Sequence, residues 1–454
     1  KGETWWVEVA SERLGLPTDP FVLVQRVTKI GDKETLKDVA ELYDIPSPMK
    51  AGTYVPASSY NGPPYDAGSP DVLGKFEIKE DGDYRLQVRD LFGGTRSDAS
   101  NVYRLIIRQA APDFKLVAWA AHMSVRQNDF GTISKPVALR AGVTMAFEVV
   151  VVRRDGFDGD IDLAMEGLPP GVTARGLKIP AGKVQGMIFI TADENAKPAF
   201  AIAKMFGRAT INGASVTRPC FLASMEWPVV YAPSDFPTSR LVADVPVSVS
   251  DSEKAPVTIA ASAGKVWEAK AGEILKIPLK LTWRNEFNGT SVKFKAYGTF
   301  FGDMKEMDVP IKAATSEAVL DLAALKTPPG DYTLAFKGIG ITKYHPNQDA
   351  VKMAEEQLKK AAQEVTTLTA AANNLAGKVT TAPAAEKIEA ANAAKIATGK
   401  QKLAEVAMAD ATQLLKTVTA AAAPKDIIDI VVSEPIQVSI KAAQVASAAA
   451  TPNK

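Results

Sequence analysis

The sequence has little of the chemistry that most catalytic and metal sites use. Its 454 residues include one cysteine, Cys220, and two histidines, His122 and His345. A disulfide within the chain is therefore excluded, and a zinc site built on cysteine and histidine is nearly so. We predict that Cys220 is a small buried hydrophobe, because a reactive thiol would need a nearby base.

The chain also lacks an excess of charge and a long apolar run. Its 53 Lys and Arg residues balance 52 Asp and Glu residues, which indicates no basic surface for nucleic acid or anionic lipid. The longest candidate, the mainly apolar segment "MAFEVVVV" at 145–152, is far shorter than the ~20 residues of a membrane span. We therefore expect no nucleic-acid partner and no membrane span.

Catalytic motifs are missing as well. Neither histidine has a G-x-S-x-G elbow nearby, and no Walker motif, G-x-G-x-x-G or metalloprotease helix motif occurs. We expect a protein that is not an enzyme and has no cofactor, although serine, threonine or paired-carboxylate chemistry between distant residues stays open. The chain starts at "KGETWWVEVA" without a signal-like segment, which is typical of a mature fragment or a piece of a longer polypeptide.

Strand-like runs separated by turn residues occupy most of the chain. They include "GKFEIKEDGDYRLQVRD", "MFGRATINGASVTRPC" and "GEILKIPLKLTW", and the second of these carries an Asn-Gly hairpin signal. We predict a mainly β fold with three β-sandwich domains in series, the first jelly-roll-like and the second and third Ig-like. A long antiparallel α-helical hairpin is inserted in the third. The predicted boundaries are 1–110 for the first sandwich, 111–232 for the second, 233–246 for a linker, 247–345 with 422–445 for the third, 346–421 for the hairpin and 446–454 for a tail.

The hairpin follows from a change to helical periodicity after residue 346. Asn347 is predicted to cap the first helix, Gly377 to end it, and Pro383 to lie near the start of a second helix over 384–421. Apolar residues at three- and four-residue spacing predict one stripe on each helix. We select as interaction residues Val351, Leu358 and Val365 on the first helix, and Ile388, Ala391, Ile396, Leu403 and Leu414 on the second.

Three interpretations of the hairpin are open. It is a self-packed decoration, an arm that binds a protein partner or a second copy of the chain, or a catalytic lid. Strand-like sequence resumes near residue 427, so the hairpin behaves as a long loop between neighbouring strands. Ordering some 75 residues costs about 1–2 kcal/mol each in backbone entropy. That cost favours the interaction arm.

Aspartate clusters form two candidate calcium sites. The first is "DGFDGDID", and the second lies around "EDGDY". Oxygen-rich turns can hold calcium, but this spacing differs from the EF-hand loop, and a solvated hairpin turn is the alternative interpretation. The candidate ligands are Asp155, Asp158, Asp160 and Asp162 in the first cluster, and Asp81 and Asp83 in the second, with Asp66, Asp71 and Asp90 as further members of the second.

Two segments near the N-terminus, "RLG" with "DP" at 13–20 and "DG.Y.L.VRD" at 81–90, are similar to the bacterial pre-peptidase C-terminal (PPC) domain. The resemblance covers about the first 110 residues. It implies a jelly-roll-like sandwich of the kind found in secreted and surface proteins beside proteases and carbohydrate-active enzymes. The chain departs from that pattern at 32–56, where an insert-like segment replaces a short acidic stretch. The segments "RDGFDGDIDLAMEGLPPGV" and "TPPGDYTLAF" resemble bacterial Ig-like or cadherin-like envelope domains.

These resemblances imply an exported bacterial protein that is periplasmic, on the cell surface or extracellular. We expect a structural or interaction protein that docks to a partner, or to itself, through the helical hairpin. One alternative is a carbohydrate-binding accessory region of a larger secreted enzyme, which would bind a glycan. Another is an auxiliary subunit of a large cell-envelope complex.

Overall fold

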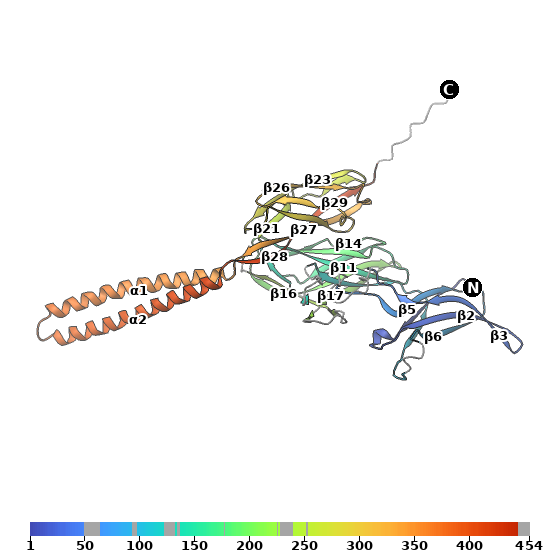
Figure 1. The fold of residues 1–454 in the computed structure, drawn as a ribbon, viewed down its shortest axis with the longest axis horizontal. Coiled ribbons are helices and arrows are strands. Elements are labelled where there is room, and N and C mark those ends of the chain that lie inside the picture. The colour runs from blue at the N-terminus through green and yellow to red at the C-terminus, as the bar shows by residue number, and fades with distance from the viewer. Residues whose placement is uncertain are drawn as a thin grey trace, which may run out of the picture.

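The protein is mainly β, with one helical hairpin near its C-terminus, as the sequence predicts (Figure 1). The structure is a computed structural model. It describes residues 1–49, 64–92, 98–121, 137–176, 178–224, 239–250 and 253–443, and only the backbone of 132–133 and 226–227.

The first sandwich packs a four-stranded sheet on a three-stranded sheet. The first sheet has the order β4 (Asp44–Ile45), β5 (Ser69–Glu77), β1 (Thr4–Ala10) and β7 (Arg104–Arg108), and the second has the order β3 (Lys33–Leu42), β2 (Pro20–Ile30) and β6 (Asp83–Asp90). The core lies between them and includes Val7, Val22 and Val72.

Strand β3 comes from the segment that the sequence analysis treats as an insert. It pairs with β2 along its whole length, and its last residue, Leu42, enters the core. This part of the insert therefore belongs to the sandwich, while 50–56 lies outside the described residues.

The second sandwich is one continuous eleven-stranded sheet that wraps around a single core. Its main path is β10 (Val137–Arg140), β20 (Asp244–Ser250), β16 (Ala199–Ile211), β17 (Ala214–Ser224), β8 (Asp113–Ala120), β11 (Thr144–Arg154), β15 (Gln185–Ala192) and β13 (Val172–Arg175); β12 (Ile161–Glu166), β14 (Lys178–Ile179) and β19 (Arg240–Val242) pair off this path. A separate short pair joins β9 (Thr132–Ile133) to β18 (Glu226–Trp227).

The predicted Asn-Gly hairpin joins β16 to β17. Asn212 and Gly213 both have positive φ, at 51° and 79°, and Ile211 pairs directly with Ala214. Two positive φ values are what a type I′ turn needs, and this turn matches the right-handed twist of the strands. The prediction of this hairpin is confirmed.

The third sandwich has a three-stranded and a six-stranded sheet. The strands are β21 (Val257–Ala261), β23 (Ile274–Trp283) and β26 (Thr315–Asp321) in one, and β22 (Trp267–Lys270), β29 (Ile436–Lys441), β27 (Gly330–Tyr344), β24 (Ser291–Tyr297), β25 (Met307–Pro310) and β28 (Lys425–Val432) in the other. Buried and exposed residues alternate along most of β23, which matches its apolar and polar alternation in the sequence.

The strand that follows the predicted linker does not belong to the third sandwich. β20 covers 244–250, pairs with β16 and β10, and buries Val245 and Val247 in the second core. The sequence analysis places the end of a linker at 246 and the start of the third domain at 247. Alternation alone identified a strand here, but it could not say which sheet has a free edge to receive it.

The three sandwiches do not lie end to end along one line. The second and third lie side by side, and they share a buried cluster of Ala146, Met187, Phe189, Ala335 and Val432. The first sandwich lies at one end of the molecule and the hairpin projects from the other (Figure 1). The hairpin therefore stands clear of all three sandwiches.

Helices α1 (Gln348–Thr381) and α2 (Lys387–Ala421) form the hairpin. α1 begins directly after Asn347, as predicted, but Asn347 is left-handed and its side chain caps no amide. The helix also continues through Gly377 to Thr381, so the predicted stop at Gly377 is wrong. A glycine within a helix costs only about 1 kcal/mol, which the pairing of the two helices can offset. None of the helices in the described ranges is apolar over enough length to span a membrane.

Candidate interaction arm and the contacts that hold it

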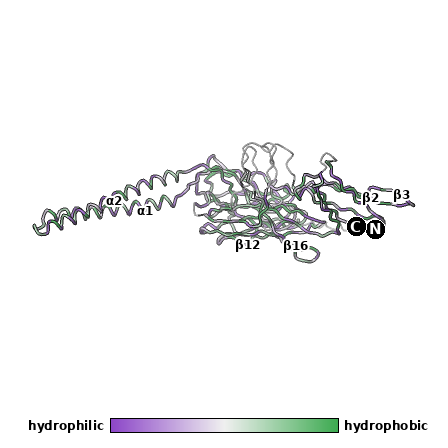
Figure 2. The backbone as a smooth tube through the Cα atoms, turned by 90° about the horizontal axis from the view of Figure 1, so that it is seen from below, coloured by the Kyte–Doolittle hydropathy of each residue, from purple (hydrophilic) through white to green (hydrophobic). Residues whose placement is uncertain are grey.

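The arm is a loop between two neighbouring antiparallel strands, as the sequence indicates. β27 and β28 pair from Lys337↔Val432 to Tyr344↔Lys425, and the hairpin grows from the open end of this two-stranded ribbon. In both views the arm extends away from the sandwiches, and polar and apolar residues alternate along both helices (Figure 2).

The face of α1 that packs on α2 agrees with the predicted stripe. Val351, Leu358 and Val365 are half-buried, and Ala354 and Ala372 are buried. These positions recur at three- and four-residue spacing, which keeps them on one side of the helix. α1 therefore supplies mostly bulky side chains to the helix pair.

The face of α2 that packs on α1 differs from the predicted stripe. Its buried residues are Ala397, Ala404 and Ala411, at seven-residue spacing. The five residues selected from the sequence all lie on the exposed side: Ile388, Ala391, Ile396, Leu403 and Leu414. Alanines are the buried residues of both helices, which lets the helices approach closely, and Met408, Leu415 and Val418 of α2 are half-buried beside them.

As a result, α2 presents a row of large apolar side chains to solvent. Ile396, Leu403 and Leu414 are 62%, 72% and 41% exposed. Their spacings of seven and eleven residues place them within about 20° of one line along the helix. We call these three residues the α2 row. Ala391 lies about 140° round the helix from Ile396, outside the row.

A second exposed apolar surface lies where the arm leaves the body. On the ribbon, Ile341 pairs directly with Ile428, and Ile339 lies on the same face. These three side chains are 43%, 57% and 59% exposed. Further along the same face, Ile430 and Val432 reach the buried cluster between the second and third sandwiches. We call Ile339, Ile341 and Ile428 the base patch.

Polar contacts fix the base of the arm to the second sandwich and to the neighbouring chain. Arg140, at the end of β10, donates to Asp429 on β28 and to Glu253 over 3.1 Å. Glu253 also accepts from the backbone amide of His345 over 3.3 Å and from the Asn285 amide over 3.2 Å. The direction of the arm is therefore set by charged groups from separate parts of the fold.

A second set of contacts holds the second and third sandwiches together. Tyr297 donates its hydroxyl to Glu148, which also accepts from Trp119 over 3.0 Å. Burial and the negative charge of Glu148 raise the pKa of Tyr297, which keeps it a donor. Lys337 lies over the Tyr297 ring at 4.9 Å. These polar contacts border the buried apolar cluster and orient one sandwich on the other.

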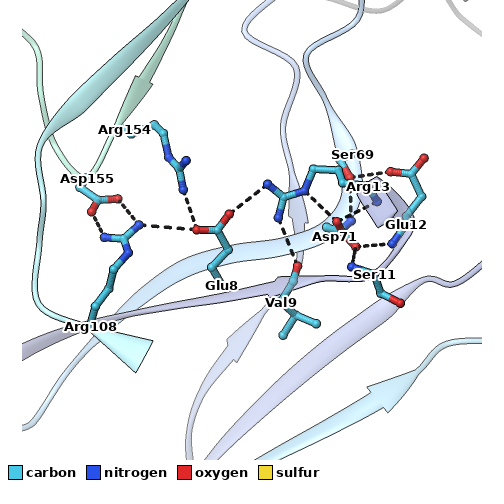
Figure 3. A network of polar contacts seen from close by, with 10 residues as sticks. All are labelled: Glu8, Val9, Ser11, Glu12, Arg13, Ser69, Asp71, Arg108, Arg154 and Asp155. Atoms are coloured by element: carbon cyan, nitrogen blue, oxygen red, sulfur yellow. Dashed lines mark hydrogen bonds and ion pairs between the residues drawn. The ribbon is translucent and has the colours of Figure 1, made fainter. Parts of the chain in front are cut away.

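An ion-pair network joins the first sandwich to the second (Figure 3). Glu8 on β1 accepts from Arg13 over 2.9 Å and from Arg154 of the second sandwich over 2.6 Å. Arg108, at the end of β7, is 3.6 Å from Glu8 and pairs with the fully buried side chain of Asp155. Because each carboxylate has an arginine partner, the buried charges are compensated.

Asp71 anchors the first-sandwich end of this network. Its carboxylate accepts from the amides of Ser11, Glu12 and Arg13 at 2.8–3.1 Å, and from Arg13 Nε over 2.7 Å. It thereby fixes the short 3₁₀ turn η1 (Glu12–Leu14). Burial raises the pKa of Asp71, but these hydrogen bonds outweigh it and hold the pKa below its ordinary value.

The predicted calcium ligands do not converge on one point. Asp155 is bound to Arg108, Asp160 to Lys178 over 2.8 Å, and Asp81 to the N-terminal ammonium over 2.5 Å. Asp158 is 3.7 Å from Arg153, while Asp162 and Asp83 lie exposed on strands β12 and β6. Within the described ranges, no three His, Cys, Asp or Glu side chains lie close enough together to hold a metal ion.

The rare residues fall in unreactive surroundings or outside the described part. Burial raises the pKa of the Cys220 thiol, so the thiolate is strongly disfavoured. His345 sits at the arm base beside Glu253, and His122 lies outside the described residues. Two aromatic residues near the N-terminus are also partly buried, since Trp5 packs on the first core and Tyr65 on the second sandwich near Trp119.

Sequence reasoning missed the three polar networks. Glu8 and Arg140 looked like ordinary strand or loop charges, since partners lie up to 289 residues away. Asp71 was grouped with the calcium candidates, but its carboxylate is bound by Arg13 and by backbone amides. The one available signal was the position of Glu8 in an otherwise apolar strand, "TWWVEVA", where a charge needs a partner if the strand is buried on both faces.

Comparison with known proteins finds distant likeness only. No protein-family model and no curated protein matches the chain. The D0–D1 domain of intimin is 12% identical, with 50% of this chain and 91% of that chain covered and a TM-score of 0.17. Domains 5–6 of the S-layer protein SbsC are 14% identical, with 45% and 89% covered and a TM-score of 0.18. Because no family model matches, the similarity to the PPC domain stays a prediction.

Proposed function

We propose that this chain is a non-catalytic, exported structural protein whose β-sandwiches hold the helical hairpin as an arm for binding another protein. The observation that carries the proposal is the α2 row: large apolar side chains stand in solvent on an element that touches no sandwich. Apolar side chains aligned along one side of a helix fit the face or groove of a partner. The polar contacts of Arg140 and Glu253 support it, because they hold the arm in one direction.

The test places a charge in the α2 row of the full chain. We expect Leu403→Glu to abolish self-association and co-purification of a partner, because a buried carboxylate would lack a counter-charge. Ala409→Glu is the matched control, since Ala409 is exposed about 120° round the helix from Leu403. Circular dichroism should show unchanged helix content in both variants.

The result that would refute the proposal is a Leu403→Glu variant that keeps its helices and all of its associations. The arm would then be a decoration. A glycan array with specific binding by the full chain would instead favour the carbohydrate-binding alternative.

A further inference from the structure

We propose that the partner of the α2 row is the same row of a second copy of this chain, in an antiparallel arrangement that makes a four-helix bundle from two arms. This inference rests on the proposed function, because it names the occupant of the arm.

The row lies beside the contact with α1, so α1 cannot cover it. Leu403 directly precedes the buried Ala404, and Ile396 precedes the buried Ala397. Neighbouring residues on a helix point about 100° apart. The row therefore faces sideways from the hairpin, where another helix can lie along α2 without disturbing the first pair.

The row is self-complementary when two α2 helices run in opposite directions. If Ile396 of one copy lies level with Leu414 of the other, Leu403 lies level with Ala407, and a bulky side chain meets a small one. A twofold axis generates each contact twice, as expected for a symmetric dimer.

The charges that border the row agree with the same alignment. Lys400 and Asp410 flank the row, and the alignment that pairs Ile396 with Leu414 also brings Lys400 level with Asp410 of the other copy. A parallel in-register alignment would instead oppose Lys400 to Lys400. With a formal net charge of +1, two copies also have little overall repulsion to overcome.

The alignment uses nearly the full length of the arm. Its centre falls at residue 405, and α2 runs over 387–421, whose midpoint is residue 404. The overlap of the two helices therefore extends over about 50 Å at 1.5 Å per residue. The two bodies lie at opposite ends, so they do not collide.

The exposed residues outside the row fit this arrangement too. Ile388, near the tip of α2, is 78% exposed. In the antiparallel alignment it lies level with Ala422 of the other copy, six residues before Ile428 of the base patch. The tip of each arm thus lies level with the start of the ribbon that carries the base patch.

Cysteine cross-linking of the full chain tests the arrangement. In the antiparallel alignment two copies of residue 403 lie about 6 Å apart along the axis, and two copies of residue 396 about 27 Å apart. We expect Leu403→Cys to form an intermolecular disulfide under mild oxidation, Ile396→Cys not to, and the Ile396→Cys/Leu414→Cys double variant to do so. Cys220 is buried and does not compete. Cross-linking of Ile396→Cys alone would overturn the antiparallel alignment.

Charge reversal tests the alignment without new bonds. We expect sedimentation analysis to show a dimer that weakens by roughly tenfold or more in Lys400→Asp and in Asp410→Lys, because each variant opposes like charges twice. A mixture of these two variants should recover the dimer. Ala409→Glu serves as the control that adds a charge away from the contact.

The outcomes separate this inference from the proposed function. A chain that stays monomeric at about 100 μM and forms no cross-link overturns the second copy as partner. If Leu403→Glu still loses a co-purifying protein, the arm binds a different partner and the proposed function stands. If Leu403→Glu changes nothing, both fail.

Discussion

At the scale of the residue, single buried charges do the work of joining parts of the chain. Asp71 is fully buried, yet it carries four hydrogen bonds, and Glu8 is shared by arginines from two sandwiches. Removing a partner from such a group costs more than the pair contributes, because a buried charge is left uncompensated. These positions are therefore sensitive to both substitution and pH.

We expect Asp71→Asn to destabilise the first sandwich by about 2–4 kcal/mol, since Arg13 would lose its buried counter-charge. The measurement is urea unfolding followed by tryptophan fluorescence, for which Trp5 and Trp6 are local probes. Asp83→Asn, at an exposed position on β6, is the control and should change little. Equal effects of the two substitutions would show that the hydrogen bonds of Asp71 contribute nothing.

The same residue sets a pH dependence whose sign follows from its lowered pKa. A carboxyl whose pKa is lower in the folded state stabilises the fold above its unfolded pKa of about 3.9. That contribution is lost as the pH falls through the folded value. Glu8 acts in the same direction, because its arginine partners outweigh burial and lower its pKa. We expect the stability gap between wild type and Asp71→Asn to be constant above about pH 5 and to close in acid.

At the scale of the element, helix α2 has two apolar faces, and its packing against α1 decides which of them is buried. α2 has an alanine face and a face of larger residues, and the alanines are the buried ones. Substitutions at two neighbouring positions, one on each face, should therefore have opposite effects on the stability of the hairpin.

We expect Ala404→Leu to lower the melting temperature of the hairpin, because extra methylene groups in a close helix contact cost about 1–3 kcal/mol. Leu403→Ala, one residue away, should leave the isolated hairpin unchanged or slightly more helical, since the leucine side chain is 72% exposed. Thermal melts by circular dichroism at 222 nm, at a concentration below self-association, distinguish the two. If Leu403→Ala is the damaging change, the faces are assigned the wrong way round.

Strands β27 and β28 should stay paired when the arm between them is removed. We expect replacement of 347–421 by a short Gly/Ser turn to leave the third sandwich folded, because Tyr344 and Lys425 are already paired. Loop length changes cost only about 0.6 kcal/mol per doubling. The measurement is the β-type circular dichroism and the cooperative melt of the shortened chain. Loss of either would mean that the helices are needed for the sandwich.

At the scale of the whole molecule, the second and third sandwiches act as one body from which the arm projects. Their shared apolar cluster is bordered by Glu148, Tyr297 and Lys337, and Arg140 links the second sandwich to the arm base. A load on the arm would therefore be carried by two sandwiches rather than one. This arrangement suits a structural protein that must hold a binding element in place.

We expect the second and third sandwiches to unfold in one calorimetric transition, and Tyr297→Phe to lower its midpoint by several degrees. Loss of the hydroxyl leaves Glu148 without one partner at a cost of about 1–3 kcal/mol, and each kcal/mol shifts the midpoint by about 2–4 °C in a unit of this size. Tyr103→Phe, at an exposed position, is the control. Two separate transitions in the wild type would contradict the single-body description.

The sequence by itself determined the elements and much of their order. Alternation marked the strands, the Asn212-Gly213 turn marked a hairpin, and the switch of periodicity near residue 347 located the arm between two strands. These features are local: period, turn chemistry and composition are read within a few residues. They were sufficient for the fold class and for placing an exposed arm.

Only the tertiary structure decided which surfaces meet. Two faces of α2 carry apolar residues, so which of them is buried depended on where α1 lies against the helix. β20 joined the second sheet because β16 and β10 have edges there, and Glu8, Asp71 and Arg140 found partners far along the chain. The positions of distant segments decide which strand edge, counter-charge or helix face is available. No local sequence pattern carries that information.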